Sequence, residues 1–213
     1  WHELIWNDTS QLIKRENTAD IKQSYFDKAE GFSGPFSNSS TVTLNPDAVF
    51  PMDDSSSFSI RLATNTRSHD LSISLNGVQK ISDQFFGFEP RQYEFKHLLA
   101  ADENQLNLEF IGQQASNDRH SIANVIFTYP RRFDFSGANF FRFHLKPTDS
   151  EKYLEILNFQ GINPVVYDIV NRQRLIAESS GNNLVKLALP GLGTDRQLVM
   201  AGQTAIRSIN NLR

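Results

Sequence analysis

The sequence lacks cysteine altogether, since none occurs among its 213 residues. This absence excludes a disulfide framework, a thiolate nucleophile and a thiolate metal ligand. Basic residues are not in excess either, because 21 Lys and Arg face 24 Asp and Glu, for a formal net charge of -3. Electrostatic binding to nucleic acid is therefore not expected, since no surplus of cations exists to displace the counterions of a phosphate backbone.

Long apolar runs and nucleotide-binding or hydrolase motifs are also missing. No run reaches the roughly 18 apolar residues of a membrane-spanning helix. Gly191-Leu192-Gly193 lacks the third glycine of a dinucleotide fingerprint, and no nucleophile elbow occurs. The chain opens at Trp1 without a signal-peptide pattern, which we interpret as trimming behind a signal peptide. We expect no catalytic residue, no cofactor and no metal ligand in this chain.

What the sequence has in quantity is phenylalanine, with 17 residues beside only 2 Met. Aromatic side chains fill the pleated surfaces of packed sheets well. From residue 40 onward apolar and polar residues alternate, as at Phe58, Ile60 and Leu62, which is typical of a strand with one buried face. Further predicted strands are 71–75, 78–81, 93–95, 106–110, 124–129, 141–145, 153–159, 164–170, 183–189 and 196–201.

Strands at this spacing, joined by turns such as Asn76-Gly77, predict an all-β chain. We expect a β-sandwich or jelly roll followed by a second, smaller antiparallel β-sandwich unit. The boundary is placed near residue 131, where Pro130-Arg131-Arg132 interrupts the alternation. The predicted domains are therefore 36–131 and 132–213, and one continuous sandwich across the boundary is the alternative.

Residues 1–35 are interpreted as an N-terminal extension or as the first strands of the sandwich. Within them, 1–6 and 22–26 are predicted strands, and the residues from Asp8 to Ile13 favour one helical turn.

The stretch from Asp83 to Phe88 is predicted to be a loop dense in phenylalanine between two strands. Its aromatic residues Phe85, Phe86 and Phe88 are the candidate contacts to a ligand or partner, as the lining of a groove or part of an interface. The alternative is that this run plugs one end of the sandwich core. Trp1 and Trp6 are further aromatic candidates for stacking on sugar rings.

Metal-ligand patterns are weak in this sequence. The five His residues show no spacing typical of a metal site, and surface or cross-strand roles are expected of them. Two oxygen-rich stretches, Asp53-Asp54 and Asp102-Glu103-Asn104, contain side chains of the kind that bind calcium. Neither has the regular spacing of a calcium-binding loop, so solvated turns are expected and bound calcium is left open.

A first series of motifs resembles galactose-binding-like jelly rolls attached to secreted bacterial enzymes. It consists of His69-Asp70-Leu71-Ser72-Ile73-Ser74-Leu75-Asn76-Gly77, then Glu103-Asn104-Gln105-Leu106-Asn107-Leu108, and finally Ala123-Asn124-Val125-Ile126-Phe127-Thr128-Tyr129-Pro130-Arg131. The chain departs from this pattern at Asn124, where the closing motif often has Asp.

A second series resembles the region before the catalytic domain in PorU-type proteins. These are gingipain-like cysteine peptidases that act as sortases of the type IX secretion system in Bacteroidota. The series consists of Tyr129-Pro130-Arg131-Arg132-Phe133, Phe141-Arg142-Phe143, Tyr153-Leu154-Glu155-Ile156-Leu157-Asn158-Phe159, Pro164-Val165-Val166-Tyr167-Asp168, Arg174-Leu175 and Leu187-Ala188-Leu189-Pro190.

This second resemblance implies a non-catalytic accessory segment of an exported cysteine peptidase or sortase, in the periplasm or at the outer-membrane surface. No catalytic residue carries over, because the His–Cys pair of that family lies in a later domain. The implied partners are the downstream peptidase domain of the same chain, exported cargo or other secretion components. A carbohydrate-binding module of a secreted or cell-surface protein, with a glycan as partner, is the alternative. A structural adhesin-like protein is a third interpretation.

Overall fold

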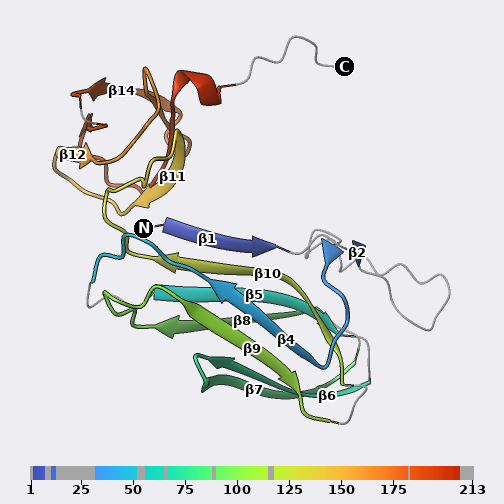
Figure 1. Cartoon of the computed structure of the whole chain (residues 1–213). Helices are drawn as coiled ribbons and strands as arrows, with labels where there is room; N and C mark the ends of the chain where they lie inside the picture. Colours follow the sequence, from blue (N-terminus) through green and yellow to red (C-terminus); the bar gives the residue numbers. More distant parts are fainter. Residues whose placement is uncertain are drawn as a thin grey trace, which may run out of the picture. The chain divides into compact units, whose positions relative to one another are not determined.

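The computed structural model describes residues 2–7, 11–12, 32–51, 56–64, 67–87, 90–114, 118–181 and 183–206. These residues form strands β1 to β16 and one short 3-10 helix, η2 (Gln203–Ala205), and no α-helix occurs in the described ranges (Figure 1). Nor do these ranges contain a helix with the length and apolar character needed to cross a membrane. The prediction of an all-β chain is confirmed.

The chain divides into two compact units. The N-terminal unit is Glu3–Tyr129, and the C-terminal unit begins at Pro130 and also includes His2. The two predicted segments at 8–13 and 22–26 and the candidate calcium loop Asp53-Asp54 fall wholly or mainly outside the described residues.

Two four-stranded sheets make up the sandwich of the N-terminal unit (Figure 1). One has the order β1 (His2–Asn7), β10 (His120–Tyr129), β5 (Ser56–Thr64) and β8 (Arg91–His97). The other has the order β4 (Ser39–Leu44), β9 (Leu106–Gly112), β6 (Ser68–Leu75) and β7 (Val78–Phe86). A short pair, β2 (Gln11–Leu12) and β3 (Phe32–Ser33), completes the strands before Tyr129.

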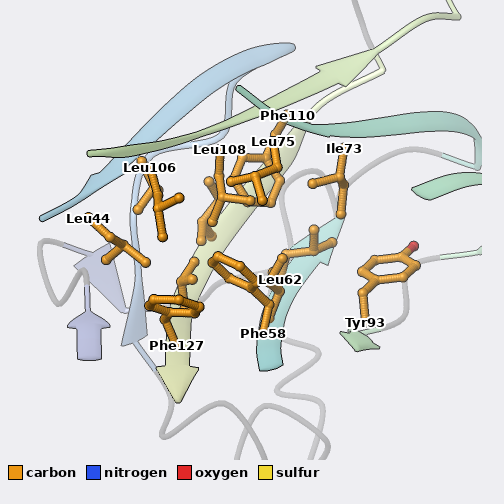
Figure 2. Close-up of a cluster of buried hydrophobic side chains, with 14 of the residues drawn as sticks. Leu44, Phe58, Leu62, Ile73, Leu75, Tyr93, Leu106, Leu108, Phe110 and Phe127 are labelled. Atoms are coloured by element: carbon orange, nitrogen blue, oxygen red, sulfur yellow. The ribbon is translucent and has the colours of Figure 1, made fainter. Parts of the chain in front are cut away.

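The core of this unit lies between the two sheets and is built by the alternation seen in the sequence. Phe58 and Leu62 of β5 project toward Leu106, Leu108 and other side chains of the facing sheet (Figure 2). Strand β10 is buried on both faces, as its continuous apolar run predicts, and it lies between β1 and β5. Burial of these apolar surfaces is the main stabilising contribution to the sandwich.

The turn at Asn76-Gly77 forms as predicted. Both residues have positive φ, 48° and 77°, and they join β6 directly to β7. The same hairpin overturns a second prediction, because Asp83 to Phe86 is not a loop but the end of β7. Pairing with β6, from Leu75 opposite Val78 to Ser68 opposite Phe86, extends the strand beyond the predicted Ile81.

One sheet of six strands forms the C-terminal unit. It comprises β11 (Phe140–Leu145), β16 (Arg196–Ala201), β13 (Val165–Asp168), β14 (Gln173–Ser179), β15 (Val185–Leu189) and β12 (Lys152–Ile156), all paired antiparallel. The sheet wraps around its own core, to which Phe143, Ile156, Val166, Leu187 and Met200 contribute from five different strands.

One of these strands, β14, was missed by the sequence analysis. It has no fully buried residue, so its alternation is weak, and pairing with β13 and β15 defines it instead. A buried ion pair joins the adjacent strands β13 and β16, with Arg196 Nη1 2.8 Å from Asp168 Oδ2. Arg196 also donates to the carbonyl oxygen of Pro190, so its guanidinium is compensated within the unit.

Candidate interaction surfaces

Of the predicted aromatic contacts, Phe85 and Phe86 point to opposite faces of β7. Phe85 points into the N-terminal core, is 5% exposed, and stacks on His69 with 4.6 Å between ring centroids. Phe86 is its neighbour on a strand, so it points to the opposite face and is 80% exposed. Phe88 and the side chains of Trp1 and Trp6 lie outside the described residues. Phe85 therefore takes the core-filling role that was the alternative.

Phe86 stands in a polar neighbourhood on the outer face of β6 and β7. It lies opposite Ser68, whose hydroxyl donates to Gln114 Oε1 at 2.6 Å. The next pair on the same face is Asp70 and Gln84, with Gln84 Nε2 donating to Asp70 Oδ2 at 3.0 Å. An exposed ring beside carboxylate, amide and hydroxyl groups has the composition of a sugar-binding platform.

Beneath Phe85, a buried polar cluster closes this end of the sandwich. Asp118 is 3% exposed and accepts hydrogen bonds from the amides of Asp70 and Gln114 and from His69 Nδ1. Burial raises the pKa of the Asp118 carboxyl, but these hydrogen bonds and the nearby His69 outweigh it and hold the pKa below its usual value. The carboxylate thereby ties the start of β6 to the segment before β10.

His120 belongs to the same cluster but lacks the hydrogen bonds that Asp118 and His69 make. It is 2% exposed, and neither ring nitrogen has a hydrogen-bond partner. Burial, with a smaller effect of His69, lowers its pKa to about 4, although Asp118 acts in the opposite direction. His69 has the cross-strand role that was expected, because it stacks on Phe85, its partner on β7, and both His69 and His120 are buried rather than at the surface. The described residues contain no group of three His, Cys, Asp or Glu side chains placed to hold a metal ion.

Of the two oxygen-rich stretches, Asp102-Glu103-Asn104 lies within the described residues, and it has a structural role. Glu103 receives hydrogen bonds from Asn76 Nδ2 and the amide of Ala100, and its carboxylate lies 2.9 Å from His97 Nε2. These contacts hold the loop before β9 against the Asn76-Gly77 turn and the end of β8.

A more extensive surface feature lies on the outer face of the C-terminal unit. Strand register places two rows of side chains side by side across four strands. The first row is Phe140, Ala201, Val165 and Ile176. The second row is Arg142, Val199, Tyr167 and Arg174. We call these eight residues the outer stripe.

The outer stripe is apolar except at two basic corners, and within it Ala201 is buried, with 6% exposure. Ile176 is 84% exposed, Phe140 49% and Tyr167 43%, while Arg142 and Arg174 flank the second row. Large apolar side chains scattered singly over a surface need no explanation, but a contiguous row marks a site of contact with another molecule or domain. Arginine beside aromatic residues is also typical of protein interfaces.

A local signal for the outer stripe was present in the sequence. In Val165-Val166-Tyr167 three apolar residues follow one another, so a strand cannot bury them all on one face. Val166 is fully buried and its two neighbours point outward. Ile176, in the strand that was missed, could not have been assigned to the same surface, because only the register with β13 brings it beside Val165.

Comparison with known proteins gives similarity of fold. No family model matches the chain, and no curated protein matches it. The crystal structure of dimeric latent PorU from Porphyromonas gingivalis is similar with a TM-score of 0.62 and 12% identity, over 97% of this chain and 20% of that chain. The chain therefore corresponds to about a fifth of that protein's length.

Two further structures overlap with part of the chain. The CBM36-1 domain of a multidomain xylanase from the hindgut metagenome of Trinervitermes trinervoides matches with a TM-score of 0.36 and 14% identity, over 59% of this chain and 96% of that domain. The insecticidal delta-endotoxin Cry8Ea1 of Bacillus thuringiensis matches with a TM-score of 0.32 and 13% identity, over 55% of this chain and 22% of that one.

Proposed function

We propose that this chain is a non-catalytic accessory segment of an exported gingipain-like cysteine peptidase, a sortase of type IX secretion. In this proposal the segment acts in the periplasm or at the outer-membrane surface. Its outer stripe packs against the peptidase domain of the same polypeptide, and cargo or other secretion components are the alternative partners of that surface. The observation that carries the proposal is the contiguous apolar row Phe140, Ala201, Val165 and Ile176.

Two physical arguments support a folded domain as the partner. The outer stripe follows strands of a rigid sheet, so it presents a preformed surface, and ordering it on binding costs little conformational entropy. Its apolar centre with an arginine rim also has the mixed character of contacts between domains of one chain. The PorU-like fold over nearly the whole chain supports a place within a longer polypeptide.

The parent gene provides the first test. We expect its reading frame to continue past Arg213 into a domain with a paired His and Cys. A reading frame that ends at Arg213 would contradict the proposal.

Oxidative footprinting provides the second test, by comparing the parent protein with this chain alone. We expect Tyr167 and Phe140 to be oxidised severalfold more slowly in the parent protein, because the peptidase domain covers them. Tyr153, which is 59% exposed on β12 and lies off the outer stripe, serves as the matched control and should react equally in both proteins. Equal oxidation of Tyr167 in the two proteins would show that the stripe is not an interdomain contact.

Phe86 and its polar neighbours support one alternative, a carbohydrate-binding module. The exposed ring would stack on a sugar face while Ser68, Asp70 and Gln84 accept or donate hydrogen bonds to hydroxyl groups. A glycan array should then reveal a binding polysaccharide, and Phe86→Ala should weaken that binding at least tenfold in calorimetry. The absence of binding across common polysaccharides counts against this function.

A further inference from the structure

The turn between β6 and β7 contains the only Asn-Gly pair in the sequence, at Asn76-Gly77. The two residues of such a pair can react with each other, because glycine has no Cβ to hinder the approach of its backbone nitrogen. The Gly77 nitrogen attacks Cγ of Asn76, and a new C–N bond closes a five-membered succinimide. The bond from Cγ to Nδ2 breaks, and the amide proton of Gly77 passes through solvent to the nitrogen that leaves as ammonia.

Water completes this chemistry by opening the succinimide at one of its two carbonyl groups. The product at position 76 is aspartate or isoaspartate, depending on which carbonyl is hydrolysed. Asn76 is exposed in the structure, so water reaches the ring directly. The reaction therefore needs no enzyme and no cofactor, and the conformation of the turn decides whether it takes place.

Two hydrogen bonds hold the carboxamide of Asn76 in the folded chain. Its Oδ1 accepts from the backbone amide of Asn107 on β9 at 2.9 Å, and its Nδ2 donates to Glu103 Oε1 at 3.0 Å. The backbone amide of Asn76 also donates to the carbonyl oxygen of Asn107 at 2.9 Å. Both polar atoms of the side chain are thus bound to segments outside the turn.

Glu103, which accepts from the Asn76 carboxamide, is itself held in place. Its Oε2 lies 2.9 Å from His97 Nε2 and accepts from the backbone amide of Ala100 at 3.3 Å. The Glu103 side chain is only 19% exposed, so water competes weakly for its oxygens. Hydrogen bonds to a carboxylate are stronger than bonds to a neutral acceptor, and a fixed carboxylate therefore restricts rotation of the Asn76 side chain.

We propose that Asn76 is a site of spontaneous deamidation that the native hairpin keeps unreactive. Ring closure brings Cγ of Asn76 within bonding distance of the Gly77 nitrogen. The carboxamide cannot make this movement while Asn107 and Glu103 hold both of its polar atoms. The reaction then occurs when this end of the hairpin opens locally and breaks the two hydrogen bonds. This property of the N-terminal unit goes beyond the proposed docking of the outer stripe and does not depend on it.

Neither product fits the native turn. Aspartate places a carboxylate oxygen where Nδ2 now donates, 3.0 Å from Glu103 Oε1, so a hydrogen bond is replaced by repulsion between like charges. Isoaspartate routes the main chain through the side chain and adds a carbon atom to it, which disrupts the tight connection of β6 to β7. Deamidation therefore loosens the hairpin irreversibly.

The first test follows the whole chain in mildly alkaline buffer, folded and in guanidinium chloride, by peptide mass spectrometry and isoaspartate methyltransferase labelling. We expect Asn76 to deamidate when denatured and at least tenfold more slowly when folded, because the hairpin opens only rarely. Asn183 is the internal control, since its φ of 58° is also positive but Leu184 follows it, and it should stay intact in both samples. Equal rates for Asn76 in the two samples would overturn the inference, as would no reaction of Asn76 in the denatured chain.

A second test separates local release of the side chain from unfolding of the whole unit. Glu103→Ala should speed deamidation of the folded chain severalfold, because it removes the acceptor of Nδ2. Ile60→Val is the matched control, since it trims the core of the same unit on β5, in the facing sheet. It should leave the rate unchanged, with the stability of both variants measured by urea unfolding. If Ile60→Val accelerates the reaction as much as Glu103→Ala, the two hydrogen bonds do not control the site.

The third test concerns the product. Asn76→Asp should lower the urea midpoint of the N-terminal unit, and adding Glu103→Gln should restore part of that loss, since glutamine offers a donor to the new carboxylate. Glu103→Gln alone should not stabilise the chain, because it removes the charged partner of His97. An Asn76→Asp chain as stable as the parent would show that deamidation does not loosen the hairpin.

Discussion

At the scale of single residues, His120 is the clearest conflict between a side chain and its surroundings. A polar ring buried without hydrogen-bond partners is costly, and its protonated form is costlier still. The folded-state pKa of about 4 lies below the ordinary value of 6.5. The unfolded chain therefore binds more protons than the folded chain between these two values, and the free energy of unfolding falls as the pH drops through that window.

We predict that His120→Leu removes this pH dependence. From the two pKa values, His120 should cost the parent chain about 2 kcal/mol of unfolding free energy between pH 7 and pH 5. Urea unfolding at both pH values gives the loss of unfolding free energy between pH 7 and pH 5 for each protein. The contributions of the other titrating groups are the same in both proteins and cancel when the two losses are subtracted. An equal loss of stability in the parent chain and the variant would mean that His120 is not the group responsible.

Some features of single residues do not follow from the local sequence. For His69 a surface or a cross-strand role was expected, and the choice between them was not local: it is 2% exposed because it stacks on Phe85 of β7 and because Asp118, far along the chain, provides its hydrogen-bond partner. Phe85 and Phe86 are adjacent and chemically identical, and only the pleat of β7 sends one inward and the other outward. No local pattern contains that information.

At the scale of elements, the Asn76-Gly77 turn is a feature that the local sequence is sufficient to predict. We expect Gly77→Ala to destabilise the N-terminal unit by roughly 1 kcal/mol, because φ at Gly77 is positive and Ala is strained there. No heavy atom lies within 4 Å of the position a Cβ would take, so the cost is one of backbone conformation and not of packing.

The matched control for the turn is Gly77→Asn, since asparagine tolerates this backbone region better than alanine. Thermal or chemical unfolding should rank the parent chain above Gly77→Asn and Gly77→Ala last. If alanine is tolerated as well as asparagine, steric strain at positive φ does not control this turn.

Strands with few buried residues show the opposite case. In β14, pairing on both sides compensates for weak alternation, and in β7 pairing with β6 carries the strand through a run that looked like a loop. Backbone hydrogen bonding to neighbours can form a strand whose own pattern is ambiguous. Such pairing depends on residues distant in sequence, so a single segment does not reveal it.

At the scale of the whole molecule, the chain has two separate hydrophobic cores, one in each unit. We predict that a cavity made in one core destabilises mainly that unit. Phe127→Ala should cost about 3–5 kcal/mol in the N-terminal unit, and Leu198→Ala about 2–5 kcal/mol in the C-terminal unit, because both side chains are fully buried.

Hydrogen exchange followed by mass spectrometry measures this separation. Phe127→Ala should raise exchange in peptides from Glu3–Tyr129, and Leu198→Ala in peptides from 140–201. Each variant is the control for the other. An equal rise of exchange in both units for either variant would mean that the two cores unfold as one.

The sequence alone determined the all-β class, most of the strands and the Asn76-Gly77 turn. These features depend on alternation and on backbone preferences that act within a few residues. Only the tertiary structure decided which residues meet. The outer stripe comes from the register of four strands, and the His69–Asp118 pair comes from a contact between distant segments. Such contacts form because buried apolar area and hydrogen bonds are satisfied globally, so interaction surfaces could not be derived from local patterns.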